Sequence, residues 1–344
     1  MIFESFPLLT NSTYLNTAYV GPMSEKLSTF RREQDEEHVS NGVKYKLKAY
    51  ENLKETHQLL GRFFGSDTKL SFVVPNFSFG VRQAISFLPK NSKILLLEED
   101  YPSLLDAFKE YDFSILLAKQ DPNIEDVIEL MLASNKIDVL ALSVVQYTTG
   151  LLIDFEFLKQ LKVKYPHLII IGDGTQFLGA HSFDFKKSPF DVIAASGYKW
   201  LLAGFGNGVL MVSEEYLKVT QIESTTLFNR IFNGHFNILS TASLNFALKE
   251  LIRQDFQKLM HKKKQLALSA KLELTSLNYI SPWVSQRPTH SSIFSLKGGQ
   301  KLYIHLTKYK IECVQRGEGV RVSFHYYNSL NDLAILMKAL KSFG

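Results

Sequence analysis

Short apolar runs recur along the first 212 residues, separated by stretches whose apolar residues mostly follow a helical period. The runs are rich in Val, Ile and Leu and end in Gly or polar residues, which is typical of buried strands in a parallel sheet. Strands that alternate with helices indicate an α/β fold. We therefore predict seven strands at residues 70–74, 93–97, 114–118, 139–145, 168–171, 192–195 and 208–212.

The last two runs are joined by a short polar turn instead of a crossover helix, so we expect the final strand to be antiparallel. Helical patterns cover residues 24–64, 81–88 and 124–133.

Beyond residue 216 the pattern changes. A long helical stretch at 239–274 is followed by strands predicted at 292–297, 310–314 and 320–324 and a closing helix at 330–342. Asn328, Ser329 and Asp332 form the start signal of that last helix. The chain also exceeds the ~250–300 residues at which one core stops growing. We therefore predict a large domain at 15–255 and a small C-terminal domain at 256–344, with residues 1–14 packing on the latter.

The composition adds constraints. The net charge of +5 comes from 39 basic and 34 acidic residues spread throughout, and the densest basic run, 261–264, reads as a solvated helix face, not a nucleic-acid site. One cysteine, Cys313, excludes an internal disulfide and fits a reducing compartment. No apolar run approaches ~20 residues and the start lacks a secretory pattern, so we expect a cytoplasmic protein without a membrane partner.

Two strand ends carry the candidate chemistry. Asp173 follows the fifth run and Lys199 follows the sixth, and the carboxyl ends of neighbouring parallel strands meet at one edge of a sheet. We therefore expect the two side chains to lie side by side. An amine can form an imine with an aldehyde cofactor, and a carboxylate can keep the pyridine nitrogen of that cofactor protonated. Taken singly, Lys199 would be a surface lysine and Asp173 a turn former.

The joint pattern of DGTQ at 173–176, SGYKW at 196–200 and GFGNGVLMV at 204–212 resembles the pyridoxal-phosphate core of the class V aminotransferase family. That family includes cysteine desulfurases, selenocysteine lyases, kynureninases and isopenicillin-N-epimerase-like enzymes. Tyr198 stands where most members have His, although kynureninase-like members also carry Tyr. The resemblance, which covers about residues 14–340, implies a fold type I enzyme with a seven-stranded, mostly parallel large domain, a smaller α+β C-terminal domain, pyridoxal 5'-phosphate as cofactor and a homodimer.

The resemblance also assigns cofactor-binding residues. The helix start at Asn76, Phe77 and Ser78 offers free N–H groups and a positive dipole end, and it matches the phosphate cup of the family. Tyr101 falls where the family places the ring that stacks on the cofactor. Gln146, after the strand at 139–145, could donate to the cofactor phenolate or the substrate; a plain polar turn is the alternative. The cofactor set is Asn76, Phe77, Ser78, Tyr101 as the stacking ring, Gln146, Asp173, Gln176, Ser196, Tyr198 and Lys199, of which Lys199 and Asp173 are the catalytic pair.

Substrate binding is assigned to three residues. The stretch 316–325 is similar to a family motif ending in Arg-[Ile/Val]-Ser-x-His, whose Arg binds the substrate carboxylate. That role falls on Arg321, since a guanidinium fork matches a carboxylate bidentately; a structural salt bridge is the alternative. Asn16 and Tyr19 lie in an N-terminal segment that resembles the one bordering the family's active site. A turn residue and a core tyrosine are the alternative interpretation of these two positions.

The reaction is predicted as action at the α-amino group of a small amino acid. We place transamination first and keep epimerisation, or β-elimination of the selenocysteine-lyase type without a persulfide cysteine, as alternatives. A non-catalytic relative that binds the cofactor is a further alternative, against which Lys199 and Asp173 count.

Two departures from the family bear on the reaction and the assembly. A desulfurase needs a loop cysteine and a His above the ring, whereas this chain has Tyr101 there and Cys313 in a predicted strand. His235 replaces a threonine that reaches the partner subunit's phosphate, which puts that contact in question. The nine histidines show no metal-ligand spacing, so no metal is expected.

Overall fold

The structure is a computed structural model that describes residues 6–343. Its centre is a seven-stranded sheet in the order β2-β8-β7-β6-β5-β3-β4. All seven predicted strands are confirmed, and β8 runs antiparallel to both of its neighbours, as predicted. The strands are β2 (Ser71–Val74), β3 (Lys93–Leu97), β4 (Ser114–Ala118), β5 (Val139–Ser143), β6 (Ile169–Asp173), β7 (Val192–Ser196) and β8 (Gly208–Val212).

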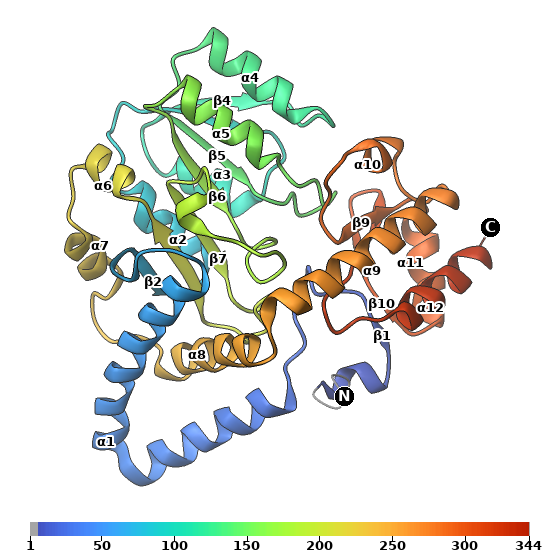
Figure 1. Ribbon diagram of the computed structural model, residues 1–344, viewed down its shortest axis with the longest axis horizontal. Coiled ribbons are helices and arrows are strands. Elements are labelled where there is room, and N and C mark those ends of the chain that lie inside the picture. The colour runs from blue at the N-terminus through green and yellow to red at the C-terminus, as the bar shows by residue number, and fades with distance from the viewer. Residues whose placement is uncertain (1–5, 344) are drawn as a thin grey trace.

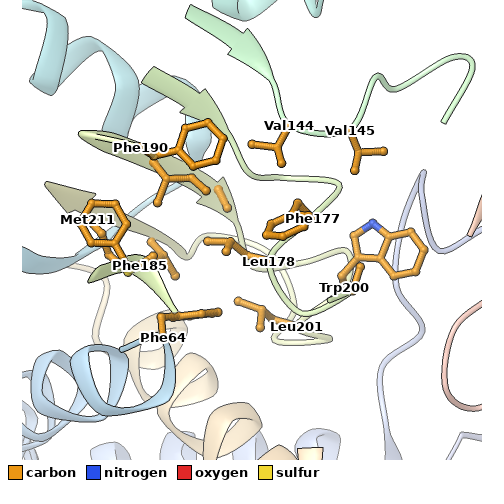
Figure 2. Packing of buried hydrophobic residues seen from close by; sticks show 14 of the residues in the cluster. Phe64, Val144, Val145, Phe177, Leu178, Phe185, Phe190, Trp200, Leu201 and Met211 are labelled. Atoms are coloured by element: carbon orange, nitrogen blue, oxygen red, sulfur yellow. The ribbon is translucent and has the colours of Figure 1, made fainter. Parts of the chain in front are cut away.

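Helices cover both faces of this sheet and make a three-layer arrangement (Figure 1). Successive strand residues point to opposite faces, so Ile170 packs into one cluster while Ile169 and Ile171 pack into the other. The first cluster, part of which Figure 2 shows around Phe177 and Trp200, is closed by α1 (Glu25–Phe63), α4 (Ile124–Ser134), α5 (Phe155–Lys164) and α8 (Ile238–Arg253). The second is closed by α2 (Phe77–Ile85), α3 (Pro102–Lys109), α6 (Glu214–Thr220) and α7 (Ser224–Ile231).

Helix α1 is bent into two arms that stand along one side of the molecule (Figure 1). Its start is fixed by Ser24, whose side chain accepts a hydrogen bond from the Leu27 N–H. The bend falls at Asn41, where φ is −139° and ψ is 39°. Asn competes with helical hydrogen bonding, which makes it a natural place for such a break.

The single helix predicted at 239–274 is wrong, because the chain forms two helices there. Helix α8 ends at Arg253, and α9 (Phe256–Ser276) begins after Asp255, whose φ is 57°. The Asp255 side chain accepts a hydrogen bond from the Lys258 N–H and so caps the second helix. The predicted domain boundary at 255/256, which remains a proposal, falls in this break.

The C-terminal part carries its own small core. An antiparallel sheet in the order β11-β12-β9 packs with helices against apolar residues of α9. The Ser329 and Asp332 side chains form a reciprocal capping box at the last helix, which confirms the predicted start signal. The elements are α10 (Pro282–Gln286), β9 (Ile293–Leu296), α11 (Gly299–Lys308), β10 (Ile311–Glu312), β11 (Val314–Arg316), β12 (Gly319–Ser323) and α12 (Leu330–Lys341).

The strand predicted at 310–314 is also wrong, because two short strands replace it. β10 pairs with β1 (Thr13–Tyr14), whereas β11 pairs with β12, and Cys313 lies between them outside any strand. At Cys313 the backbone leaves the pairing with β1 and enters the pairing with β12. Of the predicted N-terminal packing, residues 1–5 lie outside the described residues, while β1 lies on the C-terminal part. Over the described residues, no helix combines the length and apolar content that a membrane crossing requires.

Candidate active site

Asp173 and Lys199 come together at the carboxyl edge of the central sheet. Asp173 is the last residue of β6, and Lys199 lies in the turn after the neighbouring parallel strand β7. Both side chains are buried, with exposed fractions of 5% and 8%. The sequence therefore placed the two groups at the correct strand ends.

Burial shifts the pKa values of both groups toward neutrality. Burial raises the pKa of Asp173 to about 6, opposed by hydrogen bonds from Thr175 and by the positive charge of Lys199. Burial lowers the pKa of Lys199 to about 8, and the nearby Arg321 and Arg316 lower it further, against the attraction of Asp173. A carboxylate and an appreciable fraction of neutral amine can thus coexist slightly above pH 7, which suits an amine that must attack an aldehyde.

The lysine turn is held from both sides by backbone contacts. The Gly21 N–H donates to the Tyr198 carbonyl at 3.0 Å, and the Gly197 N–H donates to the Asn207 carbonyl at 2.9 Å. A Cβ atom at Gly21 would overlap the Lys199 carbonyl oxygen, so only glycine permits this approach. Gly21, near the start of the sequence, therefore belongs to the lysine site.

Gln176 fastens the N-terminal segment to this turn. Its Nε2 donates to the Ala18 carbonyl at 2.8 Å, and its Oε1 accepts from the Trp200 indole N–H at 2.7 Å. Both ends of the predicted cofactor-binding amide thus contact protein atoms. Its role in the geometry is to position Trp200, which follows Lys199 in the chain.

The start of α2 forms a cup built from two strand ends. Asn76 Oδ1 accepts from the Phe79 N–H at 2.8 Å, and Ser196 Oγ accepts from the Phe77 N–H at 3.0 Å. Within the described residues, the Ser78 N–H has no such partner, while its hydroxyl accepts from Ser103 Oγ at 2.6 Å. A helix N-terminus with a free N–H and two hydroxyls fits a phosphate group. Asn76 and Ser196 shape this cup, and Ser78 keeps an N–H that could meet an anion.

Two tyrosines flank Lys199. Its Nζ lies 5.9 Å from the ring centroid of Tyr101 and 5.6 Å from that of Tyr198. Tyr101 also packs edge-on against Tyr147 at 5.6 Å, and Tyr198 stacks on Phe205 at 4.7 Å. Burial raises the pKa of Tyr101, so its phenol keeps the proton at neutral pH. Tyr101 therefore offers a flat surface and not a proton carrier.

Sequence reasoning missed the buried carboxylate behind Tyr101. Asp100 Oδ1 accepts from the Tyr101 N–H at 2.7 Å, and its Oδ2 accepts from the Ser143 N–H at 2.8 Å. Asp100 thereby ties the Tyr101 loop to the end of β5, next to Asp173. Nothing in the run Glu98-Glu99-Asp100 singles out the third acid as the buried one.

Gln146 forms a polar turn, the alternative that the sequence had left open. Its Oε1 accepts from the Thr148 N–H at 2.6 Å and the Thr149 N–H at 2.9 Å. Its Nε2 approaches the Glu99 carbonyl at 3.5 Å. The amide oxygen is thus satisfied by the turn after β5, and only the amide nitrogen is left to serve a ligand.

Arg321 is buried without an acidic partner. The side chain is 2% exposed, and its Nη1 donates to the Tyr147 carbonyl at 2.6 Å. Among the described residues no carboxylate pairs with it, and its Nε has no hydrogen-bond partner. Burial lowers the pKa of Arg321 to about 10, and Arg316 contributes. The salt-bridge alternative thus finds no partner among residues 6–343, and a buried guanidinium with free donors is suited to bind an anion.

The N-terminal segment and the β11–β12 hairpin bring three more side chains to the site. Arg316, which the sequence analysis did not select, lies with its guanidinium carbon 5.2 Å from the ring centroid of Tyr19. Tyr19 is half exposed, whereas Asn16 is buried beside Ser323, with an Oδ1 that has no partner in the described part of the chain. The signal for Arg316 was available, since it begins the same motif that contains Arg321.

Comparisons with known proteins agree with this geometry. A family model described as Aminotransferase class-V matches residues 81–336. A probable cysteine desulfurase of Ureaplasma parvum serovar 3 is 25% identical over 295 residues, which cover 74% of this chain and 73% of that protein.

Solved structures share the fold at low identity. C-DES, in a lysine-to-alanine mutant with glycine covalently linked to the PLP cofactor, has a TM-score of 0.87 at 16% identity and covers 99% of both chains. A second C-DES structure, described as a complex between the cystine C-S lyase and its reaction product cysteine persulfide, scores 0.83 at 16% identity and covers 98% of this chain and 100% of that one. A cysteine desulfurase from Thermococcus onnurineus NA1 scores 0.80 at 15% identity and covers 99% of this chain and 96% of that one.

The family match spans most of the chain and includes both Lys199 and Asp173. The matched fold, the phosphate cup and the buried amine–carboxylate pair all fit the cofactor of that family. The chain therefore belongs to the class V aminotransferase family and is a fold type I enzyme that uses pyridoxal phosphate.

Proposed function

We propose that this enzyme cleaves the C–S bond of a small sulfur amino acid by β-elimination, without storing sulfur on the protein. The relatives named above as cysteine desulfurases and a cystine C-S lyase support a lyase reaction over the transamination that we placed first. The observation that carries the proposal is the burial of Cys313. A desulfurase stores sulfur on an accessible cysteine. The burial of Cys313 therefore favours elimination with a diffusible sulfur product over the persulfide route.

Cys313 is poorly suited to accept sulfur. It is the one cysteine of the sequence and is 6% exposed. Burial, with a contribution from the charge of Glu312, raises the pKa of Cys313 to about 12. Sulfur transfer requires an accessible thiolate, and this thiol is neither accessible nor ionised at neutral pH. Sulfur would therefore leave the site as a small molecule.

The residues of the site divide the remaining work. Arg321 would bind the α-carboxylate and hold the amino acid against Lys199, with Asn16 and Tyr19 on the substrate side. Lys199 Nζ would take the proton from Cα, after which the Cβ–S bond breaks with its electron pair on sulfur. Pyridoxal phosphate, when bound, supplies the electron sink for the charge at Cα. Asp173, ionised above about pH 6, would keep the ring nitrogen protonated.

The cofactor would be held by the groups described above. Ser78 and the start of α2 would bind the phosphate, Tyr101 would cover one face of the ring, and Lys199 would carry the cofactor covalently. Tyr198 and Gln146 would border the ring. Among residues 6–343 no three His, Cys, Asp or Glu side chains gather in a way that could hold a metal ion.

We also propose a homodimer with its sites near the interface, an expectation taken from the family. His235, which replaces the usual threonine, lies 3.4 Å from the Tyr50 hydroxyl and lines a cavity of about 440 Å³ together with Pro75 and Phe79. This cavity adjoins the cup at the start of α2. A partner subunit would thus meet His235 beside the phosphate position.

The test offers L-cysteine, L-cystine and L-alanine to the enzyme loaded with pyridoxal phosphate. Elimination predicts that L-cysteine releases sulfide and that L-cystine releases cysteine persulfide, each with one equivalent of an oxo acid and of ammonia. L-Alanine, which lacks a Cβ–S bond, serves as the control and should release none of these products. Conversion of the cofactor to its amino form with no sulfur release would replace the proposal with transamination.

A Cys313→Ala variant tests the persulfide route directly. Its rate with the sulfur substrate should stay within a few-fold of wild type, because the thiol takes no part. Mass spectrometry of the wild type after turnover should find no added sulfur on Cys313. A persulfide at Cys313 would assign the enzyme to the desulfurases and refute this half of the proposal.

A further inference from the structure

One lysine of the basic run on α9 does not face solvent. The sequence predicts 261–264 as a solvated face, which is correct for Lys262 and Lys264 but wrong for Lys263. Lys263 is 3% exposed, its Nζ donates to the Ala180 carbonyl at 2.7 Å, and it lies 5.2 Å from the ring centroid of Trp200. The side chain thus reaches from α9 to the loop after β6.

A cavity of about 510 Å³ adjoins this lysine between the β6 loop on one side and α9 with the segment before β9 on the other. Lys263, Lys264 and Lys271 contribute to its lining, together with three histidines, and the lining contains no Asp or Glu. Burial lowers the pKa of Lys263 to about 7, and no described carboxylate pairs with it. The cavity is therefore lined by amines and has no internal counter-ion that would hold them charged.

Three buried polar atoms at this cavity have no hydrogen-bond partner among the described residues. They are Ser292 Oγ, on a residue that is 1% exposed, and the Nε2 atoms of His181 and His290. Buried polar groups are rarely left unpaired in native proteins, so a ligand group beside these atoms would supply the partners that they lack. Ser292 and Lys263 are both hydrogen-bond donors, which favours an acceptor that carries negative charge.

Part of the remaining wall is apolar. Met260 and Leu268 of α9, Leu152 and Phe294 line the same cavity. A small inorganic ion would leave these surfaces facing water, whereas a molecule with an apolar body would cover them.

We propose that this cavity binds a small organic carboxylate, with its anionic end toward Lys263 and Ser292 and its apolar body against Met260 and Phe294. None of these residues belongs to the cofactor or substrate set, so the site is separate from the reaction centre. It contacts that centre through Trp200, which follows Lys199 and is anchored by Gln176. A bound carboxylate would hold the Lys263 ammonium against Trp200. Because Trp200 follows Lys199, the ligand would in this way influence the position of the lysine turn.

The experiment titrates benzoate into the enzyme loaded with pyridoxal phosphate and measures heat by calorimetry. Benzyl alcohol, with the same ring and no charge, and sulfate, with charge and no apolar body, are the ligand controls. We expect wild type to bind benzoate at least about tenfold more tightly than either control, since a charge-assisted bond is lost in one case and apolar contact in the other. Equal binding of sulfate would show an adventitious ion only and overturn the proposal.

Variants locate the binding. Lys263→Met should weaken benzoate at least about tenfold, whereas Lys262→Met, one residue away on the same helix and outside the cavity lining, should leave it unchanged. Arg321→Gln removes the substrate clamp and should leave unchanged the benzoate binding that depends on Lys263. Binding that survives Lys263→Met but is lost in Arg321→Gln would place benzoate in the active site and refute the proposal. If Lys263→Met does not fold, Ser292→Val provides the same test through the other donor.

Discussion

Replacing Arg321 with Met tests whether this buried cation serves a ligand or the fold. The guanidinium makes a hydrogen bond to the Tyr147 carbonyl but pairs with no described acid. Removing one member of a buried ion pair usually costs 3–5 kcal/mol, because the other charge is left unpaired. Arg321 leaves no such charge behind, so the usual penalty does not apply.

The stability change follows from two opposing contributions. Burial lowers the pKa of Arg321 to about 10. At about 1.4 kcal/mol for each tenfold change, keeping this charge buried costs roughly 3 kcal/mol of stability, and the substitution removes that cost. Loss of the hydrogen bond to the Tyr147 carbonyl lowers the free energy of unfolding by about 1.5–3 kcal/mol. The two largely cancel, so the free energy of unfolding should change by no more than about 1.5 kcal/mol.

Substrate binding should respond very differently. A fork that meets a carboxylate in a dry site contributes about 2–5 kcal/mol, so Arg321→Met should lower kcat/KM by roughly 30-fold to several thousand-fold. Urea unfolding measures the first effect and steady-state kinetics with L-cysteine the second, while Arg287→Met is the matched control because Arg287 does form an ion pair, with Glu125. That control should lose stability. If Arg321→Met instead lost about 3 kcal/mol of stability and kept its kcat/KM, Arg321 would be a structural residue.

The remaining predictions concern the catalytic pair and the assembly. Borohydride treatment of the loaded protein should fix the cofactor on Lys199, and a label on another lysine would contradict the site. Capture of pyridoxal phosphate by cofactor-free protein should speed up as pH rises and level off above about pH 8, since the neutral form of Lys199 attacks and its pKa is lowered to about 8; a pH-independent rate would argue against this. Asp173→Asn should retain cofactor but lose several powers of ten in rate, about 4 kcal/mol or more; near-normal turnover would remove Asp173 from its role. Sedimentation should give a dimer, and a monomer with tight cofactor binding would argue against interface sites.

The sequence alone determined the central sheet and its reactive edge. Apolar runs that stop at Gly or polar residues located all seven strands, because most of these strands are buried on both faces, although the edge strand β4 is partly exposed. The order of the runs then placed Asp173 and Lys199 at neighbouring strand ends. Local signals also sufficed where the chemistry is local, as at the Ser329 cap.

The tertiary structure decided everything that depends on which partner a residue meets. The pattern at 239–274 continues through Asp255, and only the structure shows the break, where φ of Asp255 is 57°. Helix α8 packs in the large core, whereas α9 runs from that core into the small one. In the sequence Cys313 continues the pattern of a strand, whereas in the structure the segments before and after it pair with different strands. The same holds for charge: in the sequence Lys263 cannot be told from Lys262, and Asp100 cannot be told from Glu99. Burial is set by contacts between residues far apart in the chain, and burial shifts their pKa values and creates unpaired donors.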